Sequence, residues 1–344
     1  MSGGIRGNAA RLAAVGGLLL AAGACQFLGP VGSAGVRPVQ AAVGPADHVL
    51  AISVDGLNPT ALTQLGRAEL PHFWRILDEG KSTLNARTSV EKTVTLPNHT
   101  GMITGRRVNA ALGGHGVTIN DDTDATVHEL AGHHIASIFE VAQDAGLDSA
   151  LYAGKTKFDL FENSWPDEIG TFLVEEDLPT LVTAASADLL TDQTELIFLH
   201  VQSPDVAGHE DGFMGAEYLD AVRAVDVELG RLLSAIDSEP TVADSLAIVL
   251  TADHGGETGT RGHGDRSNLE NYRIPFAAWG AGTSAGDLYE RNPDFLDPDT
   301  GLPSYAPERQ PVRNANLANL GMELLGLGSV PGSGIDAGQT LDVD

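Results

Sequence analysis

The sequence predicts an α/β fold in which a doubly wound, mainly parallel sheet carries helices on both faces. Two observations predict it. Short, nearly continuous apolar runs alternate along the chain with longer amphipathic segments, as in sheets that are buried on both faces. In addition, polar residues follow each principal apolar run at once, as expected where parallel strands end at a common ligand-binding edge.

Five apolar segments predict the strands of this sheet. They are residues 48–54, 149–154, 196–202, 246–252 and 275–280. Each is six or seven residues long, which suits a strand better than a helix.

Amphipathic segments predict the covering helices at residues 71–80, 133–146, 216–236 and 314–327. In the second of these, His133 and His134 are expected on the surface. A short helix is also expected after Pro97, with Asn98 as its N-cap and Gly105 as its stop. Thr95 would then lie just ahead of a helix N-terminus, where free N–H groups favour an anion.

The N-terminal residues predict an export signal and leader over residues 1–41. Arg6 and Arg11 precede the apolar residues 12–24, a run of signal-peptide length that is too short to span a membrane. Cleavage after Ala41 would leave residues 42–344 as one domain. Alternatively, Cys25 in AAGAC resembles the lipid-anchored residue of a bacterial lipoprotein. Both interpretations predict an exported protein that is secreted, periplasmic or at the cell surface.

Composition narrows the class of protein further. With 344 residues, 42% of them hydrophobic, the chain can form a large core. Its single cysteine allows no intrachain disulfide, so stability must come from core packing, with bound metal as a further source. The net charge of −27 would become −30 without residues 1–41, which hold three arginines and no acid. A nucleic-acid partner is therefore not expected.

Carboxylates and histidines gather in three short motifs, SPDVAGHE, TADHGG and RGHGD. Together with the aspartate after the first strand, they supply six side chains of the types that bind zinc. These are Asp55, Asp205, His209, Asp253, His254 and His263. Six ligands divide into two sets of three, each with an open coordination position, as in catalytic rather than structural zinc sites.

The order of these motifs resembles that of the alkaline phosphatase superfamily and, within it, the type I phosphodiesterase/nucleotide pyrophosphatase branch. KTVTLPNHTGMITG resembles the Thr-x-Pro-Asn-His motif of this branch, and HGVTIN resembles its His-Gly-Ile-Val-x-Asn segment. The resemblance extends from about Val49 to GSGIDAGQTL near the C-terminus. It implies an alkaline phosphatase-like fold with small loops inserted near the active site.

The resemblance also implies a role for each residue of the site. Thr95 would be the nucleophile, supported by His99, and Asn120 would hydrogen-bond a phosphoryl oxygen. One of two zinc ions would be held by Asp55, Asp253 and His254, with Thr95 Oγ as a further ligand. The other would be held by Asp205, His209 and His263.

The chain departs from nucleotide-hydrolysing relatives at the last histidine. His263 follows His254 by nine residues, whereas the corresponding histidine of those relatives lies far downstream, so an insertion that shapes a nucleotide pocket is missing. AGKTKF resembles instead the Lys-x-Arg or Lys-x-Lys of some phosphomonoesterases and phosphonate hydrolases. Lys155 and Lys157 are therefore expected to contact substrates with an extra negative charge.

The function implied is a hydrolase of small phosphoric esters, with two Zn²⁺ per chain and a phospho-threonine intermediate. It would be a phosphomonoesterase, or a phosphodiesterase of the nucleotide pyrophosphatase type. Two alternatives remain, a phosphonate hydrolase and a catalytically silent, exported metal-binding surface protein. A membrane would be a partner only through a lipid on Cys25.

Overall fold

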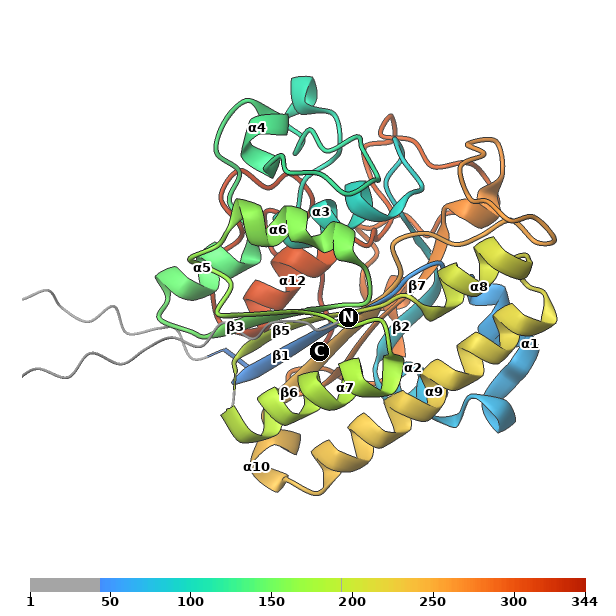
Figure 1. Cartoon of the computed structure of the whole chain (residues 1–344), viewed down its shortest axis with the longest axis horizontal. Coiled ribbons are helices and arrows are strands. Elements are labelled where there is room, and N and C mark those ends of the chain that lie inside the picture. Colours follow the sequence, from blue (N-terminus) through green and yellow to red (C-terminus); the bar gives the residue numbers. More distant parts are fainter. Residues whose placement is uncertain (1–43, 193) are drawn as a thin grey trace, which may run out of the picture. The chain divides into compact units, whose positions relative to one another are not determined.

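A mixed sheet forms the centre of the computed structural model, which describes residues 44–192 and 194–344 (Figure 1). The predicted signal at residues 1–41, with Cys25, lies outside the described residues. In the part of the chain that is described, no helix is long and apolar enough to cross a membrane.

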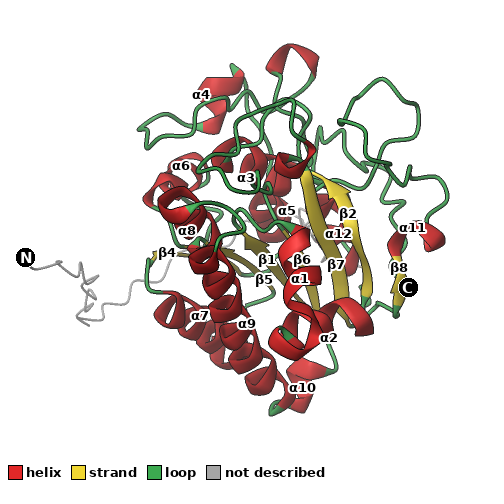
Figure 2. Cartoon of the chain, turned by 90° about the vertical axis from the view of Figure 1, so that its right-hand side faces the viewer, coloured by secondary structure: helices red, strands yellow, loops and turns green. Residues whose placement is uncertain are grey.

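The described strands form one eight-stranded sheet. They are β1 (His48–Val54), β2 (Lys81–Arg87), β3 (Ser149–Ala153), β4 (Thr171–Val174), β5 (Leu196–Val201), β6 (Leu246–Thr251), β7 (Arg273–Gly280) and β8 (Gly286–Asp287). Their order across the sheet is β4-β3-β5-β1-β6-β7-β2-β8, so β4 and β8 lie at opposite edges (Figure 2). Only β7 runs against its neighbours, β6 and β2.

All five predicted strands are present, and β1 has the predicted bounds. The strands that were not predicted are β2, β4 and β8. The reason is clearest for β2, whose sequence KSTLNAR is mostly polar although Lys81, Thr83 and Arg87 are buried. Its place near an edge of the sheet tolerates polar residues, so hydrophobic periodicity gives no signal there.

Helices cover both faces of the sheet, as predicted (Figure 1). They are α1 (Pro59–Glu69), α2 (Pro71–Glu79), α3 (Thr95–Thr104), α4 (Val127–Ala131), α5 (Ile138–Asp144), α6 (Asp159–Ser164), α7 (Leu178–Ala187), α8 (Ser203–Asp211), α9 (Ala216–Asp237), α10 (Pro240–Ala243), α11 (Leu288–Arg291) and α12 (Asn316–Leu324). The helices α1, α2, α7, α9 and α10 pack together on one face, and α3, α5 and α12 pack on the other.

The longest helix, α9, follows its sequence pattern closely. Tyr218, Leu219, Val222, Val225 and Leu229 recur at helical spacing and are all buried, because α9 packs against α2 and α7. Such a stripe of apolar residues every three or four positions is what holds a surface helix onto a core.

The predicted helix over residues 133–146 is shorter than expected. It begins only at Ile138, where the Ser137 side chain accepts a hydrogen bond from Glu140 N–H and caps the helix. His133 and His134 lie before it in a loop and are exposed, as predicted for surface residues. The Ser137 cap therefore sets the start of this helix, and the apolar pattern alone does not show it.

The strand directions place the loops that follow β1, β2, β3, β5 and β6 at one edge of the sheet. The strands β1, β5 and β6 are buried along their whole length. The residues at their carboxyl ends are therefore held by the most rigid part of the core, which is where α/β proteins bind ligands.

Candidate active site

The turn after β1 brings three carboxylates together. Asp55 is the first residue past the strand, and Gly56 follows with φ +69°. Gly56 N–H donates to Asp253 Oδ1 at 3.0 Å, and a Cβ on Gly56 would lie 3.0 Å from both Cα and Cβ of Asp205. Glycine is thus needed here both for its backbone conformation and for the close approach of Asp205.

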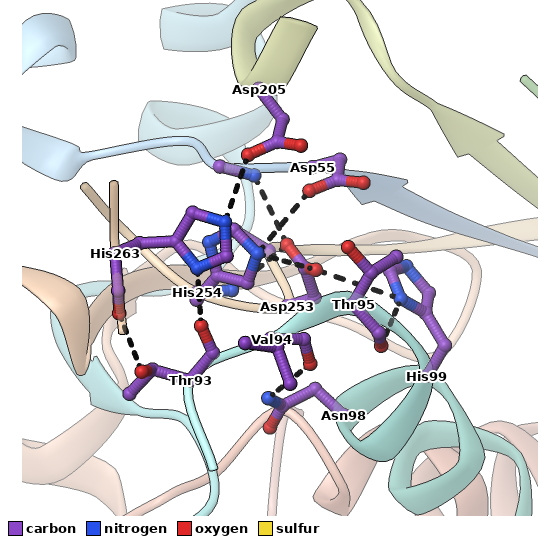
Figure 3. Close-up of polar contacts among 12 residues, drawn as sticks. Asp55, Thr93, Val94, Thr95, Asn98, His99, Asp205, Asp253, His254 and His263 are labelled. Carbon is purple, nitrogen blue, oxygen red and sulfur yellow. Dashed lines mark hydrogen bonds and ion pairs between the residues drawn. The ribbon is translucent and has the colours of Figure 1, made fainter. Parts of the chain in front are cut away.

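Asp55, Asp253 and His254 form a first group of three ligand-type side chains, here called the inner triad. One ligand atom from each lies within 4.8 Å of the others. His254 Nε2 is 3.5 Å from Asp55 Oδ1 and 3.1 Å from Asp253 Oδ2. All three side chains are fully buried, and Figure 3 shows them facing one another.

Asp205, His209 and His263 form a second group, the outer triad. Asp205 and His209 are one turn apart on α8, and His263 comes from the loop after β6. The Nε2 atoms of His209 and His263 each lie 3.5 Å from Asp205 Oδ1. The His209 side chain is 47% exposed, so this triad reaches the surface. The structure thus brings all six predicted ligands into two sets of three.

The ring orientation of the three histidines suits metal binding. Each directs Nδ1 at a backbone carbonyl: His209 at Arg261 O (2.8 Å), His254 at Gly255 O (2.8 Å) and His263 at Thr93 O (2.5 Å). A carbonyl only accepts, so Nδ1 carries the proton, and Nε2 of the neutral ring keeps its lone pair. His209 Nε2 and His263 Nε2 face each other at 3.0 Å. Two lone pairs at this distance repel unless a cation lies beside them.

Buried atoms without hydrogen-bond partners point to the same chemistry. Among the described residues they include Asp55 Oδ1, Asp205 Oδ1, Asp253 Oδ2 and His254 Nε2. A buried polar atom left without a partner costs about 1–3 kcal/mol. A cation in each triad would satisfy these atoms, and the nitrogen and oxygen donors are those that zinc prefers. The residues present therefore fit two zinc ions.

The electrostatics of the inner triad also favour a cation. Burial would raise the pKa of Asp55, but Lys155 and His200 more than offset it and hold that pKa well below its usual range. Burial would lower the pKa of His254, but Asp253 and Asp55 raise it to about 9. The carboxylates that attract a proton to His254 would attract a divalent cation in its place.

The two predicted lysines lie in the site but differ in their contacts. Lys155 Nζ donates to Asp55 Oδ2 and to Asp205 Oδ2, both at 2.6 Å, and so joins the inner triad to the outer one. Burial would lower the pKa of Lys155, but these two carboxylates raise it. Lys157 Nζ donates to Asn120 O at 2.7 Å, and burial lowers the pKa of Lys157.

Thr95 is the first residue of α3, and the prediction that Asn98 caps this helix is wrong. The helix starts four residues earlier, with Val94 as its N-cap, and Pro97 lies in its first turn, where a missing N–H costs no helical hydrogen bond. Instead, Asn98 Nδ2 donates to Lys92 O and Val94 O, at 3.0 and 2.9 Å. Asn98 thereby ties the loop before Thr95 to the helix. Gly105 ends α3 in a left-handed conformation, as predicted.

Two predicted residues support the start of α3. Asn120 Oδ1 accepts a hydrogen bond from Leu96 N–H at 2.9 Å. The two N–H donors of its Nδ2 group therefore point away from Leu96. His99 Nδ1 donates to Thr95 O at 2.9 Å, and its Nε2 accepts from the Ser53 hydroxyl, also at 2.9 Å. His99 thus joins the end of β1 to the first turn of α3, and Figure 3 shows it beside Asp253 of the inner triad.

Several supporting residues were not predicted. Thr88 and Asn314 are buried, and each contacts both Asn98 Oδ1 and the Asp253 carbonyl oxygen. Their partners are distant in sequence or belong to the backbone, so no sequence motif marks them. His200 forms a hydrogen bond with Asp55. The sequence could have identified it, because it is a lone histidine in the apolar run LIFLHV.

Comparison with known sequences agrees with this geometry. The family model of type I phosphodiesterase / nucleotide pyrophosphatase matches residues 49–277. GPI ethanolamine phosphate transferase 1 of Schizosaccharomyces pombe is 25% identical over 85% of this chain and 33% of its own length. Ectonucleotide pyrophosphatase/phosphodiesterase family member 3 of Mus musculus is 26% identical over 60% of this chain and 24% of its own length. The chain thus spans a third or less of these curated relatives.

Solved structures share the fold. Murine ectonucleotide pyrophosphatase / phosphodiesterase 5, in an inactive threonine-to-alanine variant in complex with AMP, matches with a TM-score of 0.62 and 16% identity. The match covers 83% of this chain and 96% of that one. The sheet with its covering helices is therefore an alkaline phosphatase-like fold. Since the family model covers well over half of the residues, the chain belongs to the type I phosphodiesterase / nucleotide pyrophosphatase family.

Proposed function

We propose that the protein is a zinc-dependent hydrolase of small phosphoric esters that acts through a phospho-threonine intermediate on Thr95. The observation that carries this proposal is the pairing of two three-residue ligand sets with a threonine at a helix N-terminus. Each set includes at least one buried ligand atom that has no hydrogen-bond partner in the described chain. Figure 3 shows Thr95 in one cluster with members of both triads.

In this proposal Thr95 acts as the nucleophile. Its Oγ would lose its proton and form a bond to phosphorus while the bond from phosphorus to the leaving oxygen breaks, and the leaving alcohol takes up a proton. Water would then attack phosphorus, lose a proton and release Thr95, with phosphate as the product from a monoester and a phosphomonoester as the product from a diester. Bound zinc would make the hydroxyl more acidic and would neutralise charge on the phosphoryl group. His99, through Thr95 O, fixes the turn that carries the nucleophile.

Three groups are available to bind the phosphoryl oxygens. The first turn of α3 offers backbone N–H groups and the positive end of the helix dipole. Asn120 can donate from Nδ2 because its Oδ1 is held by Leu96. The third group is the Lys157 ammonium, which donates a hydrogen bond to the carbonyl oxygen of Asn120. Such preorganised donors supply most of the catalysis in phosphoryl transfer.

The comparisons support the substrate class. The similar murine structure was solved with AMP, a phosphomonoester, and this chain has the same fold. Lys155 and Lys157 add positive charge beside the triads, which favours a dianionic phosphomonoester or phosphonate over a diester.

The test is hydrolysis of p-nitrophenyl phosphate and bis-p-nitrophenyl phosphate by the chelated protein, with and without added zinc. We expect turnover to return with zinc, and elemental analysis of the active protein to find about two zinc ions per chain. Full activity without any transition metal would contradict the zinc proposal. Zinc binding without turnover on esters or phosphonates would favour a catalytically silent metal-binding protein.

A second candidate is transfer of the phosphoryl-containing group to an alcohol. It is favoured by the match of transferase relatives across 85% of the chain and by the 47% exposure of His209, which leaves the outer triad open to an acceptor. Adding ethanolamine or glycerol to the assay separates the two activities. A transferase would form the alcohol phosphate in preference to inorganic phosphate, whereas a hydrolase would not.

A further inference from the structure

We propose that His200 is a positioning residue that sets the rotation of the Asp55 carboxylate, so that Oδ1 faces the inner triad. This role rests on the proposed zinc function. His200 lies on β5 and is fully buried, and its side-chain hydrogen bonds within the described chain go to Asp55 and Gly154, not to the outer triad. Of these two partners, only Asp55 belongs to a triad, so we expect His200 to affect metal binding through Asp55.

The hydrogen bonds of His200 define its tautomer. Nε2 lies 3.0 Å from Asp55 Oδ2, and a carboxylate oxygen accepts, so Nε2 carries the proton. On the other side of the ring, Gly154 N–H is shared between His200 Nδ1 at 3.2 Å and His200 O at 3.1 Å. Nδ1 therefore accepts, and the ring is a neutral donor aimed at Asp55.

This donor makes the two oxygens of Asp55 unequal. Oδ2 receives hydrogen bonds from both His200 Nε2 and Lys155 Nζ. Oδ1 receives none from the described residues and lies 3.5 Å from His254 Nε2. Asp55 is thus fixed to offer one oxygen to a metal ion, since turning the carboxylate would break both bonds to Oδ2.

The His200 ring is itself held in place. Its centroid is 4.2 Å from that of Phe158, at an angle of 30°, and 4.8 Å from that of His99, edge to face. In the sheet, His200 pairs with Ser53 of β1 and with Ala153 of β3. A ring packed between central strands and α3 cannot swing away, so the orientation of Asp55 is built into the core.

Loss of Lys155 and loss of His200 should have different effects, although both side chains donate to Asp55 Oδ2. Lys155 also bonds to Asp205, so its loss would disturb both triads. His200 would affect the inner triad only. A general structural role for this buried ring would instead weaken both metal sites together with the fold, and this difference makes the proposal testable.

The experiment compares His200→Phe, His200→Asn and His200→Gln in the full chain, with each zinc affinity measured by competition against a chromophoric chelator. We expect His200→Phe to weaken zinc binding at the inner triad about 10–100-fold, the usual effect of losing a partner of a metal ligand. The outer triad should stay within about threefold, because it does not contact His200. Gln can place an N–H near the position of Nε2, whereas Asn cannot, so only Gln should recover affinity.

His48→Phe is the matched control. His48 is also buried, begins β1 at the end opposite Asp55, and bonds through Nδ1 to Thr194 O. It should leave both zinc affinities unchanged. The Gln and Asn variants keep the test valid if His200→Phe does not fold, because equal affinities in these two would overturn the proposal.

Parallel weakening of both zinc sites, or unchanged inner-site affinity in His200→Phe, would also overturn the role of His200 while leaving the zinc function intact. A wild-type protein that binds no zinc would overturn the proposed function, and the role of His200 with it. The two failures are therefore distinguishable in one set of titrations.

Discussion

The inner and outer triads have the same size and similar ligand chemistry but differ in exposure to solvent at one residue, His209. Asp55, Asp253 and His254 are fully buried, whereas His209 in the outer triad is 47% exposed. A metal ion in the inner triad would be enclosed by core residues. One in the outer triad would keep access to water, substrate and chelators. If the proposed zinc ions bind, this difference predicts that the inner ion is retained and the outer one exchanges.

The difference follows from the elements that carry each triad. The inner residues come directly after β1 and β6, two strands buried along their whole length. Among the outer residues, Asp205 is buried in the first turn of α8, His209 lies near the exposed end of this helix, and His263 lies in the loop after β6. Central strands fix the positions of the residues that follow them more firmly than a surface helix or a loop does.

The largest effect is expected from Thr95→Ala, which removes the nucleophile and its contact with the inner zinc ion but leaves all six residues of the two triads in place. Turnover should fall by at least about 1000-fold, since loss of a nucleophile leaves only binding and electrostatic catalysis. Zinc content should stay at the wild-type value, as measured by elemental analysis. The control is Thr93→Ala, because Thr93 Oγ1 donates to His263 O and its loss should cost only about 1 kcal/mol of stability. A larger loss of turnover in Thr93→Ala than in Thr95→Ala would show that Thr95 is not the nucleophile.

The next effect separates the triads directly. His254→Ala should weaken the inner zinc site by more than about 100-fold and lower thermal stability, because it leaves buried carboxylates without a partner. His209→Ala should weaken the outer site and change stability little, because its ring is half exposed. Calorimetric titration with zinc and thermal melts measure both. Equal losses of stability in the two variants would contradict the proposed difference between the triads.

A smaller effect is expected for substrate choice. Replacing both Lys155 and Lys157 by Ala should lower kcat/KM for a phosphomonoester about 10–100-fold more than for a diester, because one charge-assisted hydrogen bond is worth about 1.5–3 kcal/mol. Equal losses on the two substrates would show that the lysines hold Asp55, Asp205 and Asn120 without selecting substrate charge.

The last prediction concerns stability at a residue that belongs to neither triad. Burial lowers the pKa of His115 to about 3, so in the fold it resists the proton that the unfolded chain takes up near pH 6.5. The unfolded state then binds more protons, and stability should fall as pH drops from about 6.5 towards 3. His115→Asn, which does not titrate in this range, should flatten that part of the stability profile of the chelated protein. An unchanged slope would contradict the assignment.

The six ligand-type residues of the site could be predicted from sequence more easily than the residues that hold them in place. The six ligands lie in short motifs at strand ends, and Asp253 and His254 are adjacent, so local sequence is enough to find them. The start of α3 was misplaced because Pro97 is tolerated within a first turn as well as before a helix. Asn314 was missed because it reaches Asn98 from 216 positions away, and only the folded chain brings such residues together.

The most direct test of the two-triad account is anomalous diffraction at the zinc absorption edge, on crystals grown with zinc and then soaked briefly in chelator. The account predicts two peaks before the soak, one bounded by Asp55, Asp253 and His254 and one by Asp205, His209 and His263. After the soak, the outer peak should fade first. A single peak, a peak away from both triads, or loss of the inner peak first would contradict it.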